Sequence, residues 1–286
     1  MKALRSPWTT ALVTVILCLA PGLLAMEAPV MDARTYFEQG RVAFGEGKYD
    51  QALSNFTDAL KLDPRYAEAY NARGHVYMAA ERYQQAILDY TRAVEVNSKY
   101  AEAYNNRGFA YASAGQFERA MSDFNKALEL DPRHIAAYMN RASVYEARGQ
   151  NDQAIGDYSK ALEANPSFSY AYSNRGLVFW RKGQYDNAIA DYDYALELNP
   201  KFAQAYNNRG IAYASKGQYE RAVSDQTKAL EIEPRYARAY VNRATAYYHL
   251  KEYDKAWADV HKARNLGQGI RDEFIDDLRK ASGREK

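Results

Sequence analysis

The sequence predicts an all-α fold, a solenoid of seven helical hairpins followed by a C-terminal capping helix. Three observations lead to this prediction. A pattern of small and aromatic residues repeats every 34 residues, without insertion or gap, over residues 33–270. Within each repeat the apolar positions recur three or four residues apart, which is the spacing of one face of an α-helix. A fixed period of this length is the signature of a stacked repeat architecture.

Residues 1–25 differ from the rest of the chain. Two basic residues precede an almost unbroken apolar run, and a Pro-Gly pair interrupts it shortly before Ala25. This order is typical of a secretory signal peptide, so we expect cleavage after Ala25 and a short lead over residues 26–32. An uncut membrane anchor is the alternative, although so short an apolar run spans a bilayer poorly. The only cysteine, Cys18, lies in this leader, so the mature chain would have no thiol.

The seven repeat units are each two amphipathic helices. Position 4 of the unit is always Tyr, position 8 is Gly or Ala, and positions 20 and 27 are always Ala. Positions 4, 8 and 11 share one helical face, as do positions 20, 24 and 27. Small residues at positions 8 and 20 let the two helices approach, and a Gly at position 15 ends the first helix in most units. The units are 33–66, 67–100, 101–134, 135–168, 169–202, 203–236 and 237–270.

The third unit carries the complete pattern, and it resembles the tetratricopeptide-repeat (TPR) family. That resemblance implies a right-handed superhelical solenoid that binds proteins. Two units depart from the pattern at position 24, where Gln226 and Val260 replace an aromatic residue. The residues that carry the pattern in the third unit are Tyr104, Gly108, Tyr111, Ala120, Phe124, Ala127 and Pro132.

After the last unit, apolar residues recur at helical spacing over residues 270–281, with charged residues on the other side. A repeat stack needs a polar-backed terminal helix to cover its last apolar face. We therefore expect residues 270–281 to be a capping helix and residues 282–286 to be a tail.

Charge and composition exclude several classes of function. The chain has 38 basic and 36 acidic residues, a formal net charge of +2, so no long-range field favours nucleic acid or anionic lipid. Of its 26 tyrosines, all but Tyr170, Tyr194 and Tyr248 occupy repeat positions that helix packing explains. No metal-ligand spacing, phosphate-binding loop or nucleophile motif is present. We expect no catalytic site, no cofactor, no metal and no nucleic-acid partner.

Arg at position 7 and Asp at position 23 occur together in six units. In the first unit both change together, to Gln39 and Asn55. This joint change indicates that the two positions touch, and a half-buried guanidinium needs such a partner. The predicted pairs are Arg73 with Asp89, Arg107 with Asp123, Arg141 with Asp157, Arg175 with Asp191, Arg209 with Asp225, and Arg243 with Asp259.

Asn occupies position 6 in five consecutive units, and these amides are the candidate binding site. Position 6 lies about 200° around the helix from position 4, so it faces the concave groove of a stacked array. An amide can donate to and accept from a peptide backbone at once. The alternative is that the amides bridge neighbouring helices. The fifth unit is the most aromatic stretch of the concave face, and it adds Tyr170, Trp180 and Arg181 to the candidates. The candidate groove amides are Asn106, Asn140, Asn174, Asn208 and Asn242.

These patterns predict a non-catalytic scaffold that binds an extended peptide segment of a protein partner in its concave groove. The alternative is an assembly scaffold that binds folded partners, or itself, through the convex face or the solenoid ends. The style of the repeat resembles that of bacterial TPR proteins. Together with the leader, this resemblance predicts that the protein is exported to the periplasm and that its partners are envelope proteins. If the leader stays uncut, the protein would be anchored in the inner membrane. We expect no membrane contact after cleavage.

Overall fold

The computed structural model describes residues 31–284, which contain fifteen α-helices and no strand. The predicted signal peptide lies outside the described residues. No helix among residues 31–284 has the length and apolar character needed to cross a membrane. The helices are α1 (Ala33–Gly45), α2 (Tyr49–Leu62), α3 (Ala67–Ala79), α4 (Tyr83–Val96), α5 (Ala101–Ser113), α6 (Phe117–Leu130), α7 (Ile135–Ala147), α8 (Asn151–Ala164), α9 (Ser169–Arg181), α10 (Tyr185–Leu198), α11 (Ala203–Ser215), α12 (Tyr219–Ile232), α13 (Ala237–His249), α14 (Tyr253–Asn265) and α15 (Asp272–Ser282).

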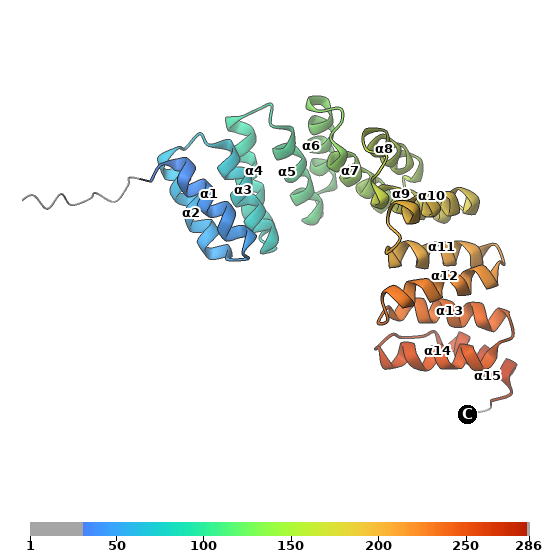
Figure 1. Cartoon of the computed structure of the whole chain (residues 1–286). Coiled ribbons are helices and arrows are strands. Elements are labelled where there is room, and N and C mark those ends of the chain that lie inside the picture. The colour runs from blue at the N-terminus through green and yellow to red at the C-terminus, as the bar shows by residue number, and fades with distance from the viewer. Residues whose placement is uncertain (1–30, 285–286) are drawn as a thin grey trace, which may run out of the picture.

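Helices α1 to α14 form seven hairpins, each of which packs against the next. We call the first helix of a unit helix A (α1, α3 and so on to α13) and the second helix B (α2, α4 and so on to α14). Figure 1 shows the hairpins side by side in a curved solenoid: α1 to α10 form an arch, and α11 to α15 continue from it in a new direction. The all-α solenoid predicted from the 34-residue period is confirmed.

Helices A and B of one unit approach closely because position 8 is Gly where an aromatic side chain of helix B lies against it. A Cβ atom added to Gly108 would stand 2.7 Å from the ring of Phe124. The Phe124 side chain is fully buried, as are Tyr90, Tyr158 and Tyr192 at the same position of other units. Burying one such ring stabilises the fold by about 2 to 3 kcal/mol. The missing Cβ therefore creates the space for the main apolar anchor of the first, second, third and fifth hairpins.

One unit places a polar residue in this space. Gln226 is 1% exposed and lies under Gly210, at the position where the first five units have Phe or Tyr. Its Nε2 donates to the main-chain oxygen of Asn207 at 2.9 Å, and its Oε1 is the one buried side-chain oxygen or nitrogen without a hydrogen-bond partner in the described part of the chain. A buried acceptor without a partner costs about 1 to 3 kcal/mol.

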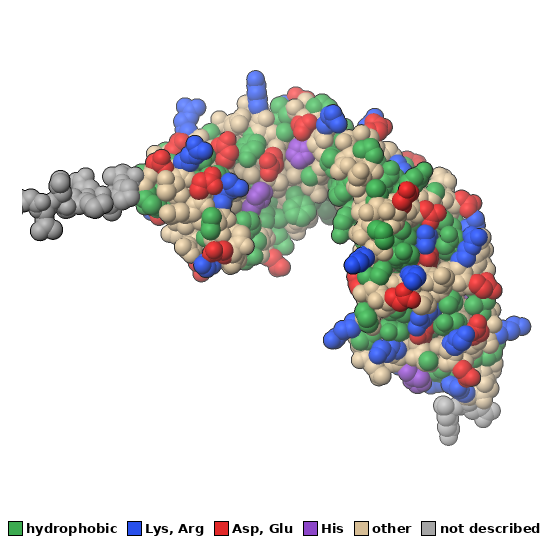
Figure 2. Space-filling model, viewed as in Figure 1, with side chains coloured by type: hydrophobic (Ala, Val, Ile, Leu, Met, Phe, Trp, Pro, Cys, Tyr) green, Lys and Arg blue, Asp and Glu red, His purple; other side chains and the backbone are tan. Residues whose placement is uncertain are grey.

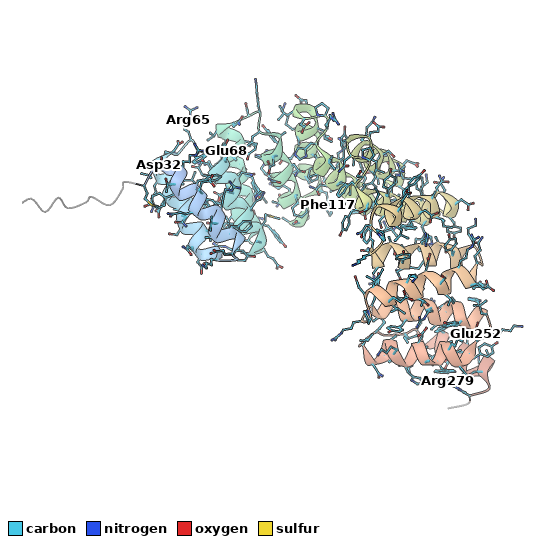
Figure 3. All side chains as sticks on the ribbon, viewed as in Figure 1. Asp32, Arg65, Glu68, Phe117, Glu252 and Arg279 are labelled. Carbon is cyan, nitrogen blue, oxygen red and sulfur yellow. The ribbon has the colours of Figure 1, made fainter. Side chains whose placement is uncertain are left out.

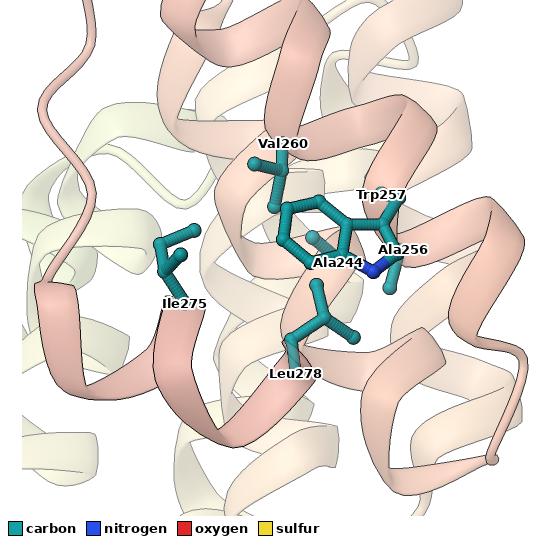
Figure 4. Packing of buried hydrophobic residues seen from close by; sticks show 6 residues of the cluster. All are labelled: Ala244, Ala256, Trp257, Val260, Ile275 and Leu278. Atoms are coloured by element: carbon teal, nitrogen blue, oxygen red, sulfur yellow. The ribbon is translucent and has the colours of Figure 1, made fainter. Parts of the chain in front are cut away.

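The C-terminal end of the solenoid is closed by α15. Ile275 and Leu278 pack against Trp257 and Val260 of α14, as Figure 4 shows. In the numbering of the repeat, α15 is a helix A of an eighth unit, with Leu278 at position 8 instead of Gly or Ala. Leu278 is fully buried in this contact, so α15 covers the apolar face of the last hairpin.

The N-terminal end has no such cover within the described residues. Val42 of α1 is 61% exposed, whereas Val76 and Val178 at the same position of later units are fully buried against the preceding helix B. A pocket of about 630 Å³ lies over this face of α1. Asp32 caps α1, its carboxylate accepting from the main-chain nitrogen of Thr35 at 2.7 Å (Figure 3). The two ends of the solenoid therefore present different surfaces.

Candidate functional site

The predicted Arg-Asp pairs are present in all six units and hold helix A to helix B. Each guanidinium makes two parallel hydrogen bonds to one carboxylate, and Arg141 makes both to Asp157 at 2.7 Å. The side chain of Arg141 is 19% exposed and that of Asp157 8%. The same geometry recurs in Arg73–Asp89, Arg107–Asp123, Arg175–Asp191, Arg209–Asp225 and Arg243–Asp259.

Each of these arginines also reaches the preceding unit, a contact that the sequence analysis missed. The Nη1 of Arg175 donates to the hydroxyl of Ser159 at 2.9 Å, and Ser159 lies on helix B of the preceding unit. The corresponding acceptors sit at position 25 and are short polar side chains in every case, so one guanidinium joins three helices. The other acceptors are Thr57, Thr91, Asn125, Asp193 and Thr227.

Electrostatics keeps these pairs ionised. The hydrogen bonds to Asp157 raise the pKa of Arg141 above its ordinary value, and burial opposes them only in part. Burial raises the pKa of Asp191, and the facing Arg175 opposes that rise. Because each of the three guanidinium nitrogens donates to an internal acceptor, the Arg ladder belongs to the scaffold.

Three of the five candidate groove amides bridge neighbouring units. The Nδ2 of Asn106 donates to the Oδ1 of Asn71 at 3.0 Å, and Asn140 makes the same bond to Asn105. Asn242 donates in the same way to the Oδ1 of Asn207, which is at position 5 of the preceding unit. These three amides therefore bridge neighbouring helices, as the alternative describes, and each bridge uses one of the two N–H donors of the amide.

Asn174 and Asn208 differ from the other three. Position 5 of the preceding unit is Met139 or Ser173 in these two cases, and neither supplies an amide oxygen. Within residues 31–284 the side chain of Asn174 makes no hydrogen bond, and Asn208 only accepts one, from the Nδ2 of Asn207 at 3.1 Å. Both side chains are half-buried. The structure thus leaves two amides of the five-residue ladder, on α9 and α11, with both N–H donors free within the described part of the chain.

The three other predicted groove residues belong to different environments. The indole nitrogen of Trp180 donates to the hydroxyl of Ser215 at 3.0 Å, and Arg181 forms an ion pair with Glu146 of the preceding unit. Trp180 and Arg181 therefore link neighbouring units, and their part in binding a partner stays a prediction. Tyr170 is 54% exposed, and its ring lies 4.8 Å from that of Phe202.

Apolar residues at position 9 lie on the same helices as the free amides. Leu177 of α9 and Ile211 of α11 are half-buried, and Phe109 of α5 is 48% exposed.

Figure 2 shows acidic and basic side chains interspersed over the face in view, without a patch of one sign. Among the described residues no group of three or more metal-ligating side chains is suited to hold an ion. The arrangement offers hydrogen bonds and apolar contacts along helices A.

These features define a helical-repeat scaffold. The chain belongs to the tetratricopeptide-repeat family. Models described as tetratricopeptide repeat match residues 101–134, residues 139–201 with 173–234, and residues 226–258, and one described as TPR repeat matches residues 40–81 with 74–115. Proteins of this fold are interaction scaffolds that bind other proteins and are generally non-catalytic. None of the curated proteins matches the chain.

Several solved structures are similar to the chain. A TPR protein from Parabacteroides merdae is 24% identical, with a TM-score of 0.63, over 87% of this chain and 98% of that one. YrrB, described as a TPR protein with an unusual peptide-binding site, is 26% identical, with a TM-score of 0.53, over 64% of this chain and 95% of its own. MamA is 28% identical, with a TM-score of 0.53, over 58% of this chain and 96% of its own.

Proposed function

We propose that this protein is a non-catalytic scaffold that binds an extended peptide segment of a partner protein along helices A of the fifth and sixth units. The observation that carries the proposal is the pair of free amides on Asn174 and Asn208. The other three amides of the ladder each use one of their two N–H donors in a bridge, whereas Asn174 and Asn208 use neither within residues 31–284. Two amides one unit apart suit a backbone that runs across the helices.

The two amides alone would bind a peptide too weakly. A net hydrogen bond contributes about 1 kcal/mol, so two amides cannot offset the cost of association, which is at least about 4 kcal/mol. Tyr170, Leu177 and Ile211 lie on the same two helices and supply aromatic and apolar surface. Tyrosine is a frequent anchor in protein interfaces. The peptide-binding site described for YrrB, which is similar to this chain, also supports the proposal.

The partner proposed is a protein of the bacterial cell envelope. The support is the leader over residues 1–25, whose basic start and apolar run are typical of export. The mature protein would begin at Met26 in the periplasm, or stay at the inner membrane if the leader is uncut. Mass spectrometry of the protein recovered from a bacterial host, with and without inhibition of signal peptidase, tests this: an intact N-terminus in both samples would contradict cleavage.

The binding proposal is tested by crosslinking and capture from an envelope extract. We expect Asn174→Ala with Asn208→Ala to remove the captured proteins. The matched control is Asn187→Ala with Asn265→Ala, which removes two exposed amides from helices B. If the groove variant captures the same proteins as the control, the groove proposal fails, and binding through the convex face or the solenoid ends becomes the better explanation. The exposed Val42 face of α1 is then the surface to change next.

A further inference from the structure

A second feature of helices A is a pocket of about 510 Å³ in the first three units. Its apolar wall includes Phe37, Phe44 and Tyr100, and its polar lining includes His75, Glu68 and Glu102. The pocket exists because side chains are missing. Ala72 stands at position 6, where the next five units have Asn, and Gly45 stands at position 13 of the first unit.

The pocket carries uncompensated negative charge. Glu68 and Glu102 occupy position 2 of successive helices A, are exposed, and form no ion pair within residues 31–284; Figure 3 labels Glu68 on α3. The one cation of the lining, Arg41, is paired with Glu38 at 3.1 Å. Burial lowers the pKa of His75, which is therefore neutral at pH 7.

The two carboxylates line the same pocket as the phenol of Tyr100. The pKa of Tyr100 is raised to about 12, first by burial and then by Glu102 and Glu68, so both charges reach the same phenol. That phenol is part of the pocket wall. An occupant of the pocket therefore meets both aromatic rings and two carboxylates.

We propose that this pocket binds a lysine or arginine side chain of the peptide that occupies the groove. Aromatic rings suit the aliphatic stem of such a side chain and attract its cation, and the carboxylates pair with its charge. An acidic or apolar anchor would leave Glu68 and Glu102 unpaired or oppose them. The inference rests on the proposed function, because it assigns a basic anchor to the same ligand.

The first test uses a random-sequence peptide library displayed on phage and selected on the full chain. We expect the selected peptides to share a basic residue, and a selected peptide to bind the Glu68→Gln/Glu102→Gln variant about five- to tenfold more weakly. The matched control, Glu95→Gln/Glu129→Gln, removes the same charge from two exposed positions on helices B and should bind normally. A library result without a basic preference, or an equal loss in the control, overturns the proposal.

The second test does not depend on peptide binding. Nα-acetyl-arginine methylamide is titrated into the full chain, and the ring resonances of His75, assigned with His75→Asn, are followed by NMR. We expect them to move at millimolar concentration in the native chain and to stay in place in Glu68→Gln/Glu102→Gln. The uncharged citrulline analogue should move neither.

The two tests separate the possible failures. If no peptide is selected but the arginine derivative moves His75, groove binding is wrong and the cation pocket stands. If peptides are selected through Asn174 and Asn208 but the arginine derivative has no effect, or acts equally on the glutamine variant, the cation pocket is wrong and groove binding stands.

Discussion

At the scale of single residues, each arginine of position 7 joins three helices. The joint change to Gln39 and Asn55 in the first unit was enough to predict the pairing with Asp. The third contact was not predictable in the same way, because position 25 is Thr, Asn, Ser or Asp in different units and shows no single repeated residue. The bridges at position 6 were only the alternative interpretation for a similar reason: their acceptor, position 5, changes from unit to unit.

Replacing Arg141 with Leu should lower the free energy of unfolding more than replacing both Arg141 and Asp157 with Leu. The single change leaves a carboxylate that is 8% exposed without its cation, which costs about 3 to 5 kcal/mol. The double change leaves no buried charge, so we expect a smaller loss. Urea denaturation followed by circular dichroism compares the two. Equal or greater destabilisation by the double change would show that the charge pair itself supplies the stability.

Gln226→Tyr should stabilise the protein by about 1 to 3 kcal/mol, because it removes the buried oxygen without a partner and restores the ring that other units place there. The space exists, since Tyr192 occupies the same position beneath Gly176. The reverse change, Tyr192→Gln, is the control and should destabilise. A lower denaturation midpoint for Gln226→Tyr would contradict this account.

His75 should make stability depend on pH. Its pKa in the folded chain is lowered by burial, although Glu102 opposes the shift, so the unfolded chain takes up a proton first as the pH falls. The stability that His75 contributes is complete above its unfolded pKa of about 6.5 and is lost below it. Between about pH 7.5 and about pH 5.5 we expect the free energy of unfolding to fall more in the native chain than in His75→Asn. Parallel curves would exclude His75 as the cause.

At the scale of helices, the 34-residue period predicted every helix A to begin at position 1, and the structure has α1, α3 and α5 beginning at Ala33, Ala67 and Ala101. The end of the solenoid was less regular. The capping helix runs from Asp272 to Ser282, whereas the apolar spacing suggested a start at residue 270. The capping helix lies outside the repeat, so its sequence could not be aligned with other units, and its start was predicted from apolar spacing alone.

Leu278→Ala should loosen the last hairpin more than the others. Leu278 is fully buried against Trp257 and Val260, and removing such a side chain costs about 2 to 5 kcal/mol. Because a repeat contacts only its neighbours, the loss should be local. Fluorescence of Trp257, measured in a Trp180→Phe background, should change at lower urea than the circular dichroism of the whole chain. Coincident transitions would argue against a local effect.

At the scale of the whole molecule, two neighbouring junctions lack the amide bridge. They join the fourth unit to the fifth and the fifth to the sixth, where Met139 and Ser173 replace Asn at position 5. The direction of the solenoid changes beyond α10, close to these junctions, as Figure 1 shows. The free amides of the proposed binding site thus lie at junctions that lack the amide bridge and are linked instead by Arg181–Glu146 and Trp180–Ser215.

Ser173→Asn should add the missing bridge to Asn208, as Asn207 does for Asn242 at 2.8 Å. Asn at position 5 is 3 to 5% exposed in three other units, so the larger side chain fits. We expect a gain of about 1 kcal/mol in stability. We also expect weaker peptide binding, because the new bridge uses an amide N–H of Asn208 that the peptide would otherwise accept from. Ser173→Ala is the control. Stronger peptide binding by Ser173→Asn would contradict the role given to Asn208.

The leucine at position 8 of α15 also has a consequence for assembly. Within residues 31–284 the α1 end of the stack leaves the apolar Val42 face exposed, whereas α15 presents charged residues at the other end. Two copies that met through the α1 face would be related by a twofold axis, and such an assembly would close at two. Leu278, which anchors α15 to the last hairpin, thus makes the two ends of the stack unequal as surfaces for a second copy.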